Sequence, residues 1–165
     1  MGVPLHDALV IVDDAYRHHG SRDRVTFIGA GRVITGADAA YAMALDADLV
    51  CIGRGFLFAI GCIQALRCHT KECPTGVATQ SRWRQRGLVP VEKRGRVANY
   101  GRAVREDLMV VTRSLGLRSP GELRREHVEV VVDIGRRMRV SELYPYPPLA
   151  LQVLTDEAIM RYASA

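Results

Sequence analysis

The sequence predicts an α/β fold built from parallel β/α units. Two observations support this: segments with helical periodicity alternate with short β-branched runs over residues 5–66, and both β-branched runs end in glycine-containing turns. The order is helix, strand, helix, strand, helix, with short connections. Two strands make neither an open sheet nor a barrel, and no strand precedes the first helix. We therefore expect upstream strands to be missing from this chain.

The first predicted helix covers residues 5–16, where apolar residues recur at three- and four-residue steps and charged residues fill the opposite side. Gly20 provides its C-terminal stop. Thr35 opens a second helix, because Thr35 and Asp38 have the spacing of a capping box. The residues expected on the core face of this helix are Ala39, Ala42, Met43 and Leu45.

Two buried strands are predicted at residues 25–30 and 49–52, where β-branched and other apolar residues run up to glycine. Cys51 lies inside the second strand and is expected in the core. The turn Gly53-Arg54-Gly55 then leads into an apolar helix at residues 56–66.

Beyond residue 66 the helical periodicity is first lost and then returns. Pro and Gly interrupt the chain where it is lost, which is typical of a loop. The predicted elements are a loop at 67–90, a long helix at 96–115 closed by Gly116, a short helix at 119–126 opened by a capping box, a strand at 128–132, an extended segment at 144–148 and a last short helix from Thr155.

The charge of the chain is basic, with a net value of +5 that comes mainly from arginine. A polyanionic partner would account for this charge, but a solvated, arginine-rich surface is the simpler interpretation. A single Trp and the lack of interleaved aromatic residues argue against nucleic-acid binding. The most basic stretch contains Arg82, Arg84, Arg86, Lys93, Arg94 and Arg96.

The sequence contains no membrane or export signal. No apolar run reaches the roughly 18 to 20 residues that span a bilayer, and the N-terminus lacks the charged start and apolar core of a signal peptide. We therefore expect a cytoplasmic protein without a membrane span. In that reducing compartment, clustered thiols indicate a metal or redox site rather than disulfides.

Two glycine-rich turns follow the two predicted strands, at residues 29–32 and 53–55. Glycine lets main-chain amides approach a phosphate closely, and in (β/α)8 barrels the loops after the last two strands form the usual phosphate site. The dinucleotide-binding pattern is not met, because its third glycine position is Ile34. Ordinary βα turns remain the alternative interpretation.

Three of the four cysteines, Cys62, Cys68 and Cys73, lie within twelve residues, separated by five and four residues. Structural zinc sites usually show closer pairs and four ligands, and His69 is the one nearby candidate for a fourth. Three thiolates suit an iron–sulfur cluster with one open iron corner. The alternative is that these thiols are structurally inert.

Residues 61–80, which read Gly-Cys-Ile-Gln-Ala-Leu-Arg-Cys-His-Thr-Lys-Glu-Cys-Pro-Thr-Gly-Val-Ala-Thr-Gln, resemble the cluster loop of the glutamate synthase family. In that family three cysteines at this spacing hold a [3Fe-4S] cluster. Residues 31–55 resemble the last two β/α units of its FMN-binding barrel. The segments 86–90, 96–99 and 142–145 resemble the tail of its single-domain FMN-binding members.

The resemblance implies an incomplete (β/α)8 TIM barrel: its last β/α units at residues 1–61, the cysteine cluster loop and linker at 62–94, and a helical C-terminal extension at 95–165. It implies Cys62, Cys68 and Cys73 as cluster ligands. It also implies that the FMN phosphate lies against main-chain amides near Gly31, Arg32, Gly53 and Arg54. Two positions depart from the family pattern: Ala30, where Asp or Ser is frequent, and Asp46, where glycine is usual.

The implied function is that of a C-terminal fragment of a glutamate synthase-type oxidoreductase, in which FMN mediates reductive amination of 2-oxoglutarate to glutamate. The amino group would come from glutamine or ammonia, and electrons would pass through the cluster from a donor such as ferredoxin. A complementary barrel half would supply the acid/base and 2-oxoglutarate residues, which cannot be named here. The alternatives are a small iron–sulfur electron-transfer module and an inactive remnant.

Overall fold

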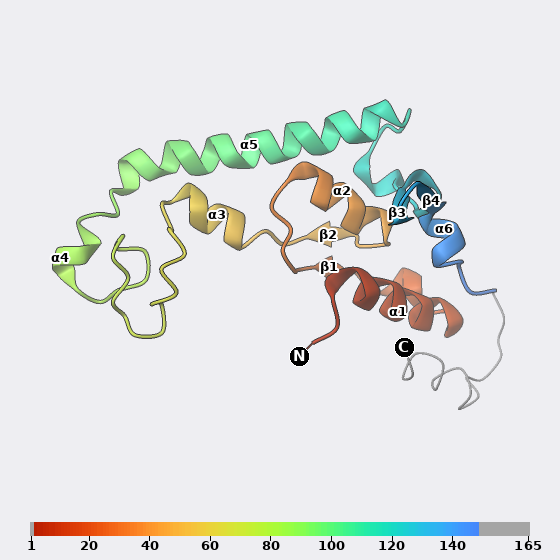
Figure 1. The fold of residues 1–165 in the computed structure, drawn as a ribbon, viewed down its shortest axis with the longest axis horizontal. Coiled ribbons are helices and arrows are strands. Elements are labelled where there is room, and N and C mark those ends of the chain that lie inside the picture. The colour runs from red at the N-terminus through yellow and green to blue at the C-terminus, as the bar shows by residue number, and fades with distance from the viewer. Residues whose placement is uncertain (1, 149–165) are drawn as a thin grey trace.

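The computed structural model of the protein describes residues 2–148, so the helix predicted from Thr155 lies outside the described residues. The fold mixes helices and strands, and no closed barrel is formed by the part of the chain described (Figure 1). The elements of the first part are α1 (Leu5–His18), η1 (Arg22–Arg24), β1 (Ile28–Gly29), α2 (Gly36–Ala44), β2 (Leu49–Val50) and α3 (Arg54–Ala59). Those that follow are α4 (Arg82–Gln85), α5 (Pro90–Ser114), η2 (Pro120–Glu122), η3 (Arg125–His127), β3 (Glu129–Asp133), β4 (Arg136–Arg139) and α6 (Val140–Leu143).

Strands β1 and β2 pair in parallel, with Ile28 opposite Leu49, which confirms the predicted parallel connection. The prediction that they are buried is wrong: Ile28 is 61% exposed, Leu49 is 55% exposed and Cys51 is exposed. Each strand is only two residues long and has one neighbour among the described residues. A strand is buried only when a layer packs on each face. Here one face is packed, since Gly29 is buried and Val50 contacts the main core, but nothing within residues 2–148 covers the face of Ile28 and Leu49.

The first two helices are confirmed with their end signals. Helix α1 ends at His18, and Gly20 after it has a left-handed φ of 61°. Helix α2 has the predicted capping box, since Thr35 Oγ1 accepts from the Asp38 amide at 3.1 Å and Asp38 accepts from the Thr35 amide at 2.9 Å. Ala39, Ala42 and Leu45 on its predicted core face are fully buried, and Met43 is partly buried.

The middle of the chain differs from the prediction in helix bounds. Helix α3 starts earlier and ends at Ala59, not at Leu66, because Gly61 takes a φ of +105° that breaks the helix. Helix α5 begins at Pro90, six residues before the predicted start, with Pro at its first turn. The short helix α4 lies in the predicted loop, capped by the Ser81 side chain. Figure 1 shows α5 running across α2 and α3.

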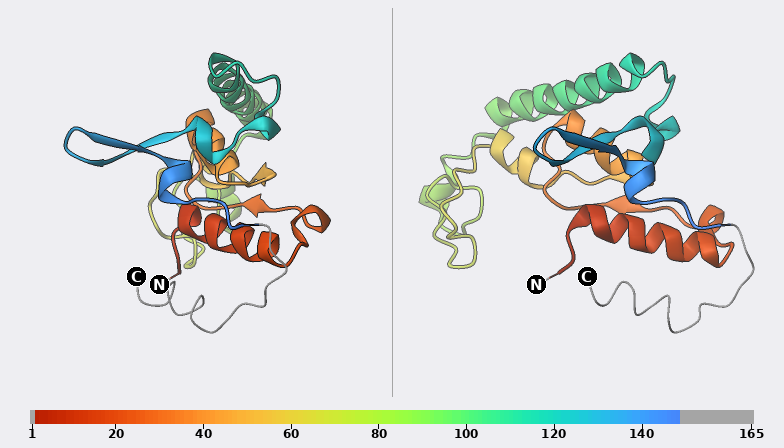
Figure 2. Two further views of the ribbon diagram at one scale, coloured as in Figure 1. Left: turned by 90° about the vertical axis from the view of Figure 1, so that its right-hand side faces the viewer. Right: turned by 45° about the vertical axis from the view of Figure 1, so that its right-hand side comes forward.

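The C-terminal extension is not purely helical. The short α-helix predicted from Ser119 is two 3₁₀ turns. Its predicted capping box does not form, since Glu122 accepts from the Arg118 amide and Ser119 accepts from the Gly121 amide. The strand predicted at 128–132 is β3, shifted by one residue. Strand β4 and helix α6 were not predicted. The hairpin of β3 and β4 extends away from the helices (Figure 2).

The main hydrophobic core lies between α1, α2 and the C-terminal segment. Leu9 and Val10 of α1 pack with Ala42 of α2 and with Leu45 just after it, and Val140 of α6, which has no exposed surface, completes this cluster. A second, smaller cluster joins α2 to Leu123 under α5. Residues beyond 120 therefore belong to the same core as the first two helices.

A buried ion cluster fixes the C-terminal segment to this core. Arg125 is fully buried and donates to Asp46 at 2.9 Å, to Asp13 at 3.1 Å and to Asp14 at 2.8 Å. Its fourth partner is the Tyr144 carbonyl oxygen at 3.1 Å. A buried charge requires such complete pairing, because desolvation otherwise costs several kcal/mol. We did not predict this cluster from the sequence.

Asp46 has the backbone of a glycine position, with a φ of +71°. This geometry explains why glycine is usual there, since left-handed φ carries no steric cost for glycine. The carboxylate compensates by joining the ion cluster, where it also accepts from Arg17 at 3.0 Å and from the Tyr146 hydroxyl at 3.0 Å. The Tyr146 ring lies under the Arg125 guanidinium, 4.3 Å from its centroid.

Candidate cofactor site

Two exposed glycine turns follow the parallel strands and lie side by side. A 2.8 Å main-chain hydrogen bond joins the two strand ends just before the turns. Gly31 and Arg32 are exposed, and Arg32 has a left-handed φ of 56°. Gly53 and Arg54 are also exposed, and a Cβ at Gly53 would meet nothing within 4 Å. The structure thus places all four predicted phosphate residues at the carboxyl end of one parallel pair.

The donor set of these turns fits a phosphate group. Among hydrogen bonds between residues 2–148, none uses the amides of Arg32, Gly53 or Arg54. The Arg32 and Arg54 guanidinium groups form no ion pair within the same part of the chain. Exposed amides and free guanidinium groups are the donors that bind phosphate oxygens.

Two amides just before α2 are already used. Ile34 and Thr35 donate to Asp38 Oδ2 at 3.0 and 2.9 Å. Burial alone would raise the pKa of Asp38, but these hydrogen bonds outweigh it and lower the pKa. An ionised carboxylate therefore caps α2, and a phosphate would have to bind to the turns themselves.

Cys73 lies in a tight loop closed by an antiparallel bridge between Glu72 and Thr79. Its side chain is buried, with 7% of the residue exposed. The Thr75 hydroxyl, 3.4 Å from the sulfur, and main-chain amides within residues 75–78 lower the pKa of the Cys73 thiol to about 7. The loop therefore stabilises a thiolate, which is the form that binds iron.

Cys62 and Cys68 are more open. Cys62 lies three residues beyond the end of α3, not on the helix as predicted, and its sulfur accepts from the Gln64 amide at 3.5 Å. Cys68 is exposed. Within residues 2–148 no group of three His, Cys, Asp or Glu side chains could hold a metal ion, so the three sulfurs do not meet at one centre here. The donors are nevertheless of the right chemistry, since all three are free thiols.

The backbone of the cysteine loop is strained. Gln64, Leu66 and Lys71 take positive φ values of 55°, 54° and 61°, in the left-handed region that costs energy for residues with a side chain. Such strain is concentrated at sites that hold ligands.

A cavity of about 420 Å³ adjoins Cys62, where the cysteine loop meets the start of α5. Two cations of α5 line it, and Lys93 Nζ would lie 3.4 Å from a Cβ at Gly61. The lining residues are Phe58, Ile60, Gly61, Cys62, Ile63, Thr75, Gly87, Lys93 and Arg96.

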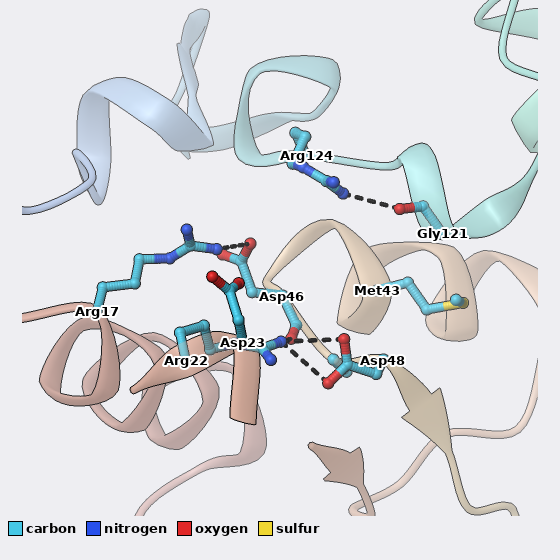
Figure 3. A pocket seen from close by; sticks show the side chains of 9 residues that line it. Arg17, Arg22, Asp23, Met43, Asp46, Asp48, Gly121 and Arg124 are labelled. Atoms are coloured by element: carbon cyan, nitrogen blue, oxygen red, sulfur yellow. Dashed lines mark hydrogen bonds and ion pairs between the residues drawn. The ribbon is translucent and has the colours of Figure 1, made fainter. Parts of the chain in front are cut away.

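A second cavity, of about 290 Å³, lies at the edge of the ion cluster (Figure 3). Its arginines are already paired: Arg17 with Asp46 at 3.0 Å, and Arg22 with Asp48 at 3.0 Å. Arg124 donates to the Gly121 carbonyl oxygen at 2.9 Å. These groups hold α1, β2 and the C-terminal segment together, so we interpret the cavity as part of the packing between these elements and not as a ligand site.

Sequence reasoning missed two residues that act on the predicted sites. Thr75 could have been found, because a threonine two residues after a cysteine can hydrogen bond back to it. Helical periodicity places Tyr100, described below, on the inward face of the helix predicted at 96–115, but no local signal identifies its partner Ile34, which is 66 residues away.

Parallel β/α units with exposed glycine turns, followed by a loop of free thiols, define an α/β protein, and its known relatives belong to an oxidoreductase family. Residues 1–118 match the family model described as a conserved region in glutamate synthase. The chain belongs to the glutamate synthase family.

Three relatives illustrate the match. The glutamate synthase large subunit-like protein YerD of Bacillus subtilis is 38% identical over 87% of this chain, and the archaeal glutamate synthase [NADPH] of Methanocaldococcus jannaschii is 34% identical over 75%. The ferredoxin-dependent glutamate synthase 2 of Synechocystis is 40% identical over 59%. The chain spans about a quarter of the first two relatives, 27% and 24% of their lengths, and the match covers 6% of the third.

No helix within residues 2–148 is long and apolar enough to cross a membrane.

Proposed function

We propose that this chain forms the C-terminal part of a glutamate synthase-type oxidoreductase, supplying half of an FMN phosphate site and the thiolate ligands of a [3Fe-4S] cluster. The observation that carries the proposal is the Cys73 loop. Its hydroxyl and amide donors stabilise a thiolate in a loop whose sequence resembles the family's cluster loop. Cys62 and Cys68 would complete the ligand set.

The phosphate of FMN would lie against the turns that contain Gly31, Arg32, Gly53 and Arg54. Their exposed amides and unpaired arginine side chains support this placement. In a (β/α)8 barrel these would be the turns after the last two strands. The exposed faces of β1 and β2 would then pack against a complementary barrel half, which would bring the acid/base and 2-oxoglutarate residues.

The cofactors define the chemistry that this chain serves. When bound, FMN would supply the hydride that reduces the imine of 2-oxoglutarate to glutamate, with nitrogen from glutamine or ammonia, and the cluster would relay electrons to it. The chain's own residues would bind the phosphate and hold the cluster thiolates. Cluster binding requires reduced thiols, which the cytoplasm maintains, so we place the protein there.

The surface around the cysteines suits an acidic electron donor such as ferredoxin. Residues 62–96 contain eight Lys and Arg and two Glu, a net charge of +6 against +5 for the whole chain, so the remainder carries −1. Leu66 and Trp83 on this surface are 80% and 75% exposed. Helix α4 packs directly on the cysteine loop, since a Cβ at Gly76 would lie 2.4 Å from the Arg84 carbonyl oxygen.

Donor binding has a direct test. The binding of reduced ferredoxin should weaken as the salt concentration rises, because the attraction is between exposed charges. The charge reversal Arg86→Glu should weaken it further than Arg113→Glu, which changes the same charge at the far end of α5. Equal effects of the two variants, or no effect of salt, would rule out this surface.

The proposal as a whole is tested by the iron content, flavin content and visible absorption of the chain purified without oxygen. We expect broad visible absorbance and roughly three irons per chain, as three thiolate ligands to a [3Fe-4S] cluster require. FMN bound alongside would indicate that a partner or a second copy completes the barrel. A colourless, iron-free chain would refute the cluster and leave an inactive remnant, whereas iron without flavin would favour an electron-transfer module.

Cysteine variants provide the matched control. Cys73→Ser should lose the iron, because the thiolate held by Thr75 is removed. Cys51→Ser changes an exposed cysteine outside the cysteine loop and should retain it. Loss of iron in both variants would show that the effect is one of folding.

A further inference from the structure

Tyr100 of α5 contacts the segments that follow both glycine turns. Its hydroxyl donates to the Ile34 carbonyl oxygen at 2.5 Å, just after the first turn. In the second turn the same hydroxyl lies 1.8 Å from where a Cβ of Gly55 would stand. The Tyr100 ring packs edge-on against Phe56 with a centroid separation of 4.9 Å. One side chain thus reaches behind both turns.

Helix α5 holds this side chain in a fixed place. The helix is 25 residues long, and it packs so closely on α2 that a Cβ at Gly36 would lie 2.4 Å from the Leu108 amide nitrogen. Phe56 lies 3.6 Å from where a Cβ of Gly101 would be. A backbone contact at Gly36 and a ring contact at Gly101, one near each turn, therefore fix the position of Tyr100 relative to the two turns.

The sheet alone gives the turns little support. Strands β1 and β2 are two residues long each, so few ladder hydrogen bonds fix their spacing. Two turns can bind one phosphate only when their amides stay within reach of the same oxygens. A contact that spans both turns supplies the constraint that longer strands would otherwise provide.

We propose that Tyr100 is a positioning residue of the phosphate site, whose hydroxyl keeps the turns of Arg32 and Arg54 at the spacing that a single phosphate requires. Tyr100 does not touch the ligand; it acts through Ile34 and Gly55. This inference rests on the proposed FMN phosphate site, and it links the phosphate site to the helix that starts beside the cysteine loop.

The test compares FMN with riboflavin, which is the same flavin without the phosphate, on the full chain. Tyr100→Phe removes one hydroxyl and leaves the ring against Phe56. We expect FMN to bind about tenfold more weakly, the order expected when a partly buried carbonyl loses its hydrogen bond, and riboflavin binding to stay unchanged. A mutant that keeps the wild-type preference for FMN would overturn the proposal.

Tyr146→Phe is the matched control, because it removes a hydroxyl that donates to Asp46 at 3.0 Å, beyond the opposite end of α2. It should lower stability without changing the ratio of the two flavin affinities. If Tyr146→Phe changes this ratio as much as Tyr100→Phe does, the effect is one of general stability and the proposal fails.

Hydrogen exchange of the flavin-free chain separates this inference from the proposed function. In Tyr100→Phe the hydrogen-bonded amides beside each turn should exchange faster, those of Ile34 and Thr35 at the first turn and that of Leu57 at the second, whereas in Tyr146→Phe they should not. Unchanged exchange in either turn would refute the role of Tyr100. Wild-type binding that does not distinguish FMN from riboflavin would refute the phosphate site instead, and the exchange result would then decide alone whether Tyr100 holds the turns.

Discussion

Replacing Arg125 by Met should remove about 3 kcal/mol from the free energy of unfolding, the lower end of the cost of removing one partner from a buried ion pair. Met keeps most of the side-chain volume, so the loss is electrostatic. Asp13 and Asp46 would stay buried without their shared guanidinium group. The lower end applies because Arg17 still pairs with both carboxylates.

Urea unfolding followed by circular dichroism measures this loss, which is a large part of the roughly 5–15 kcal/mol that stabilises a typical domain. Arg105→Met is the control, because Arg105 is exposed on α5 and forms no ion pair within residues 2–148. It should change stability by no more than about 0.5 kcal/mol. Equal losses in the two variants would refute the structural role of the ion cluster.

The pH dependence gives the same prediction a second readout. Burial, and after it the negative charge of Asp13, raise the pKa of Asp46 above its ordinary value of 3.8. The folded state therefore binds a proton on Asp46 more tightly than the unfolded state does. This contribution to the free energy of unfolding is fully present below pH 3.8 and is lost as the pH rises through the raised pKa. Removing Arg125 raises this pKa further. The deficit of Arg125→Met should therefore be largest near neutral pH and shrink on acidification; a constant deficit would contradict this reasoning.

Three further predictions concern the turns, the α2 cap and the cysteine loop. Gly55→Ala should lower the free energy of unfolding by about 1–3 kcal/mol, because the new Cβ collides with the Tyr100 hydroxyl. Gly95→Ala, on the open surface of α5, should raise it by about 0.5–1 kcal/mol. Urea unfolding measures both changes, and a change of the same sign in the two variants would exclude the collision. Thr35→Ala should cost about 1 kcal/mol in the same assay through loss of the α2 cap, and a neutral result would mean that Asp38 caps α2 alone. In the metal-free chain, alkylation of Cys73 should follow a pKa of about 7, and Thr75→Val should move this pKa upward; an unmoved profile would mean that the main-chain amides suffice.

Local signals in the sequence predicted local structure well. The capping pair of Thr35 and Asp38 and the apolar periodicity of α1 depend on residues three or four apart, and both elements form as predicted. The turn and thiol residues were also identifiable, because their chemistry is carried by short motifs. The end of α3 was missed, since the periodic apolar pattern continues past Gly61 while the backbone does not.

Long-range features could not be predicted from these signals. Arg125 lies 112 residues from Asp13 and 79 from Asp46, and nothing around Arg125 in the sequence marks it as buried. The exposure of β1 and β2 could not be predicted either, because their residues are as apolar as those of buried strands. Whether such a strand is buried depends on what packs against it, and the strand's own sequence does not specify that.

Because one helix, α5, contacts both the cysteine loop and the glycine turns, the number of residues between its two contacts determines which way each contacting side chain points. Lys93 beside Gly61 and Tyr100 beside Gly55 are two turns apart on one helix, about 10 Å at 1.5 Å per residue. One residue inserted between them would rotate Tyr100 by about 100° away from the turns. Evolution can therefore lengthen or shorten the loop before α5 residue by residue, but between positions 93 and 100 it can change only the identity of the residues, not their number.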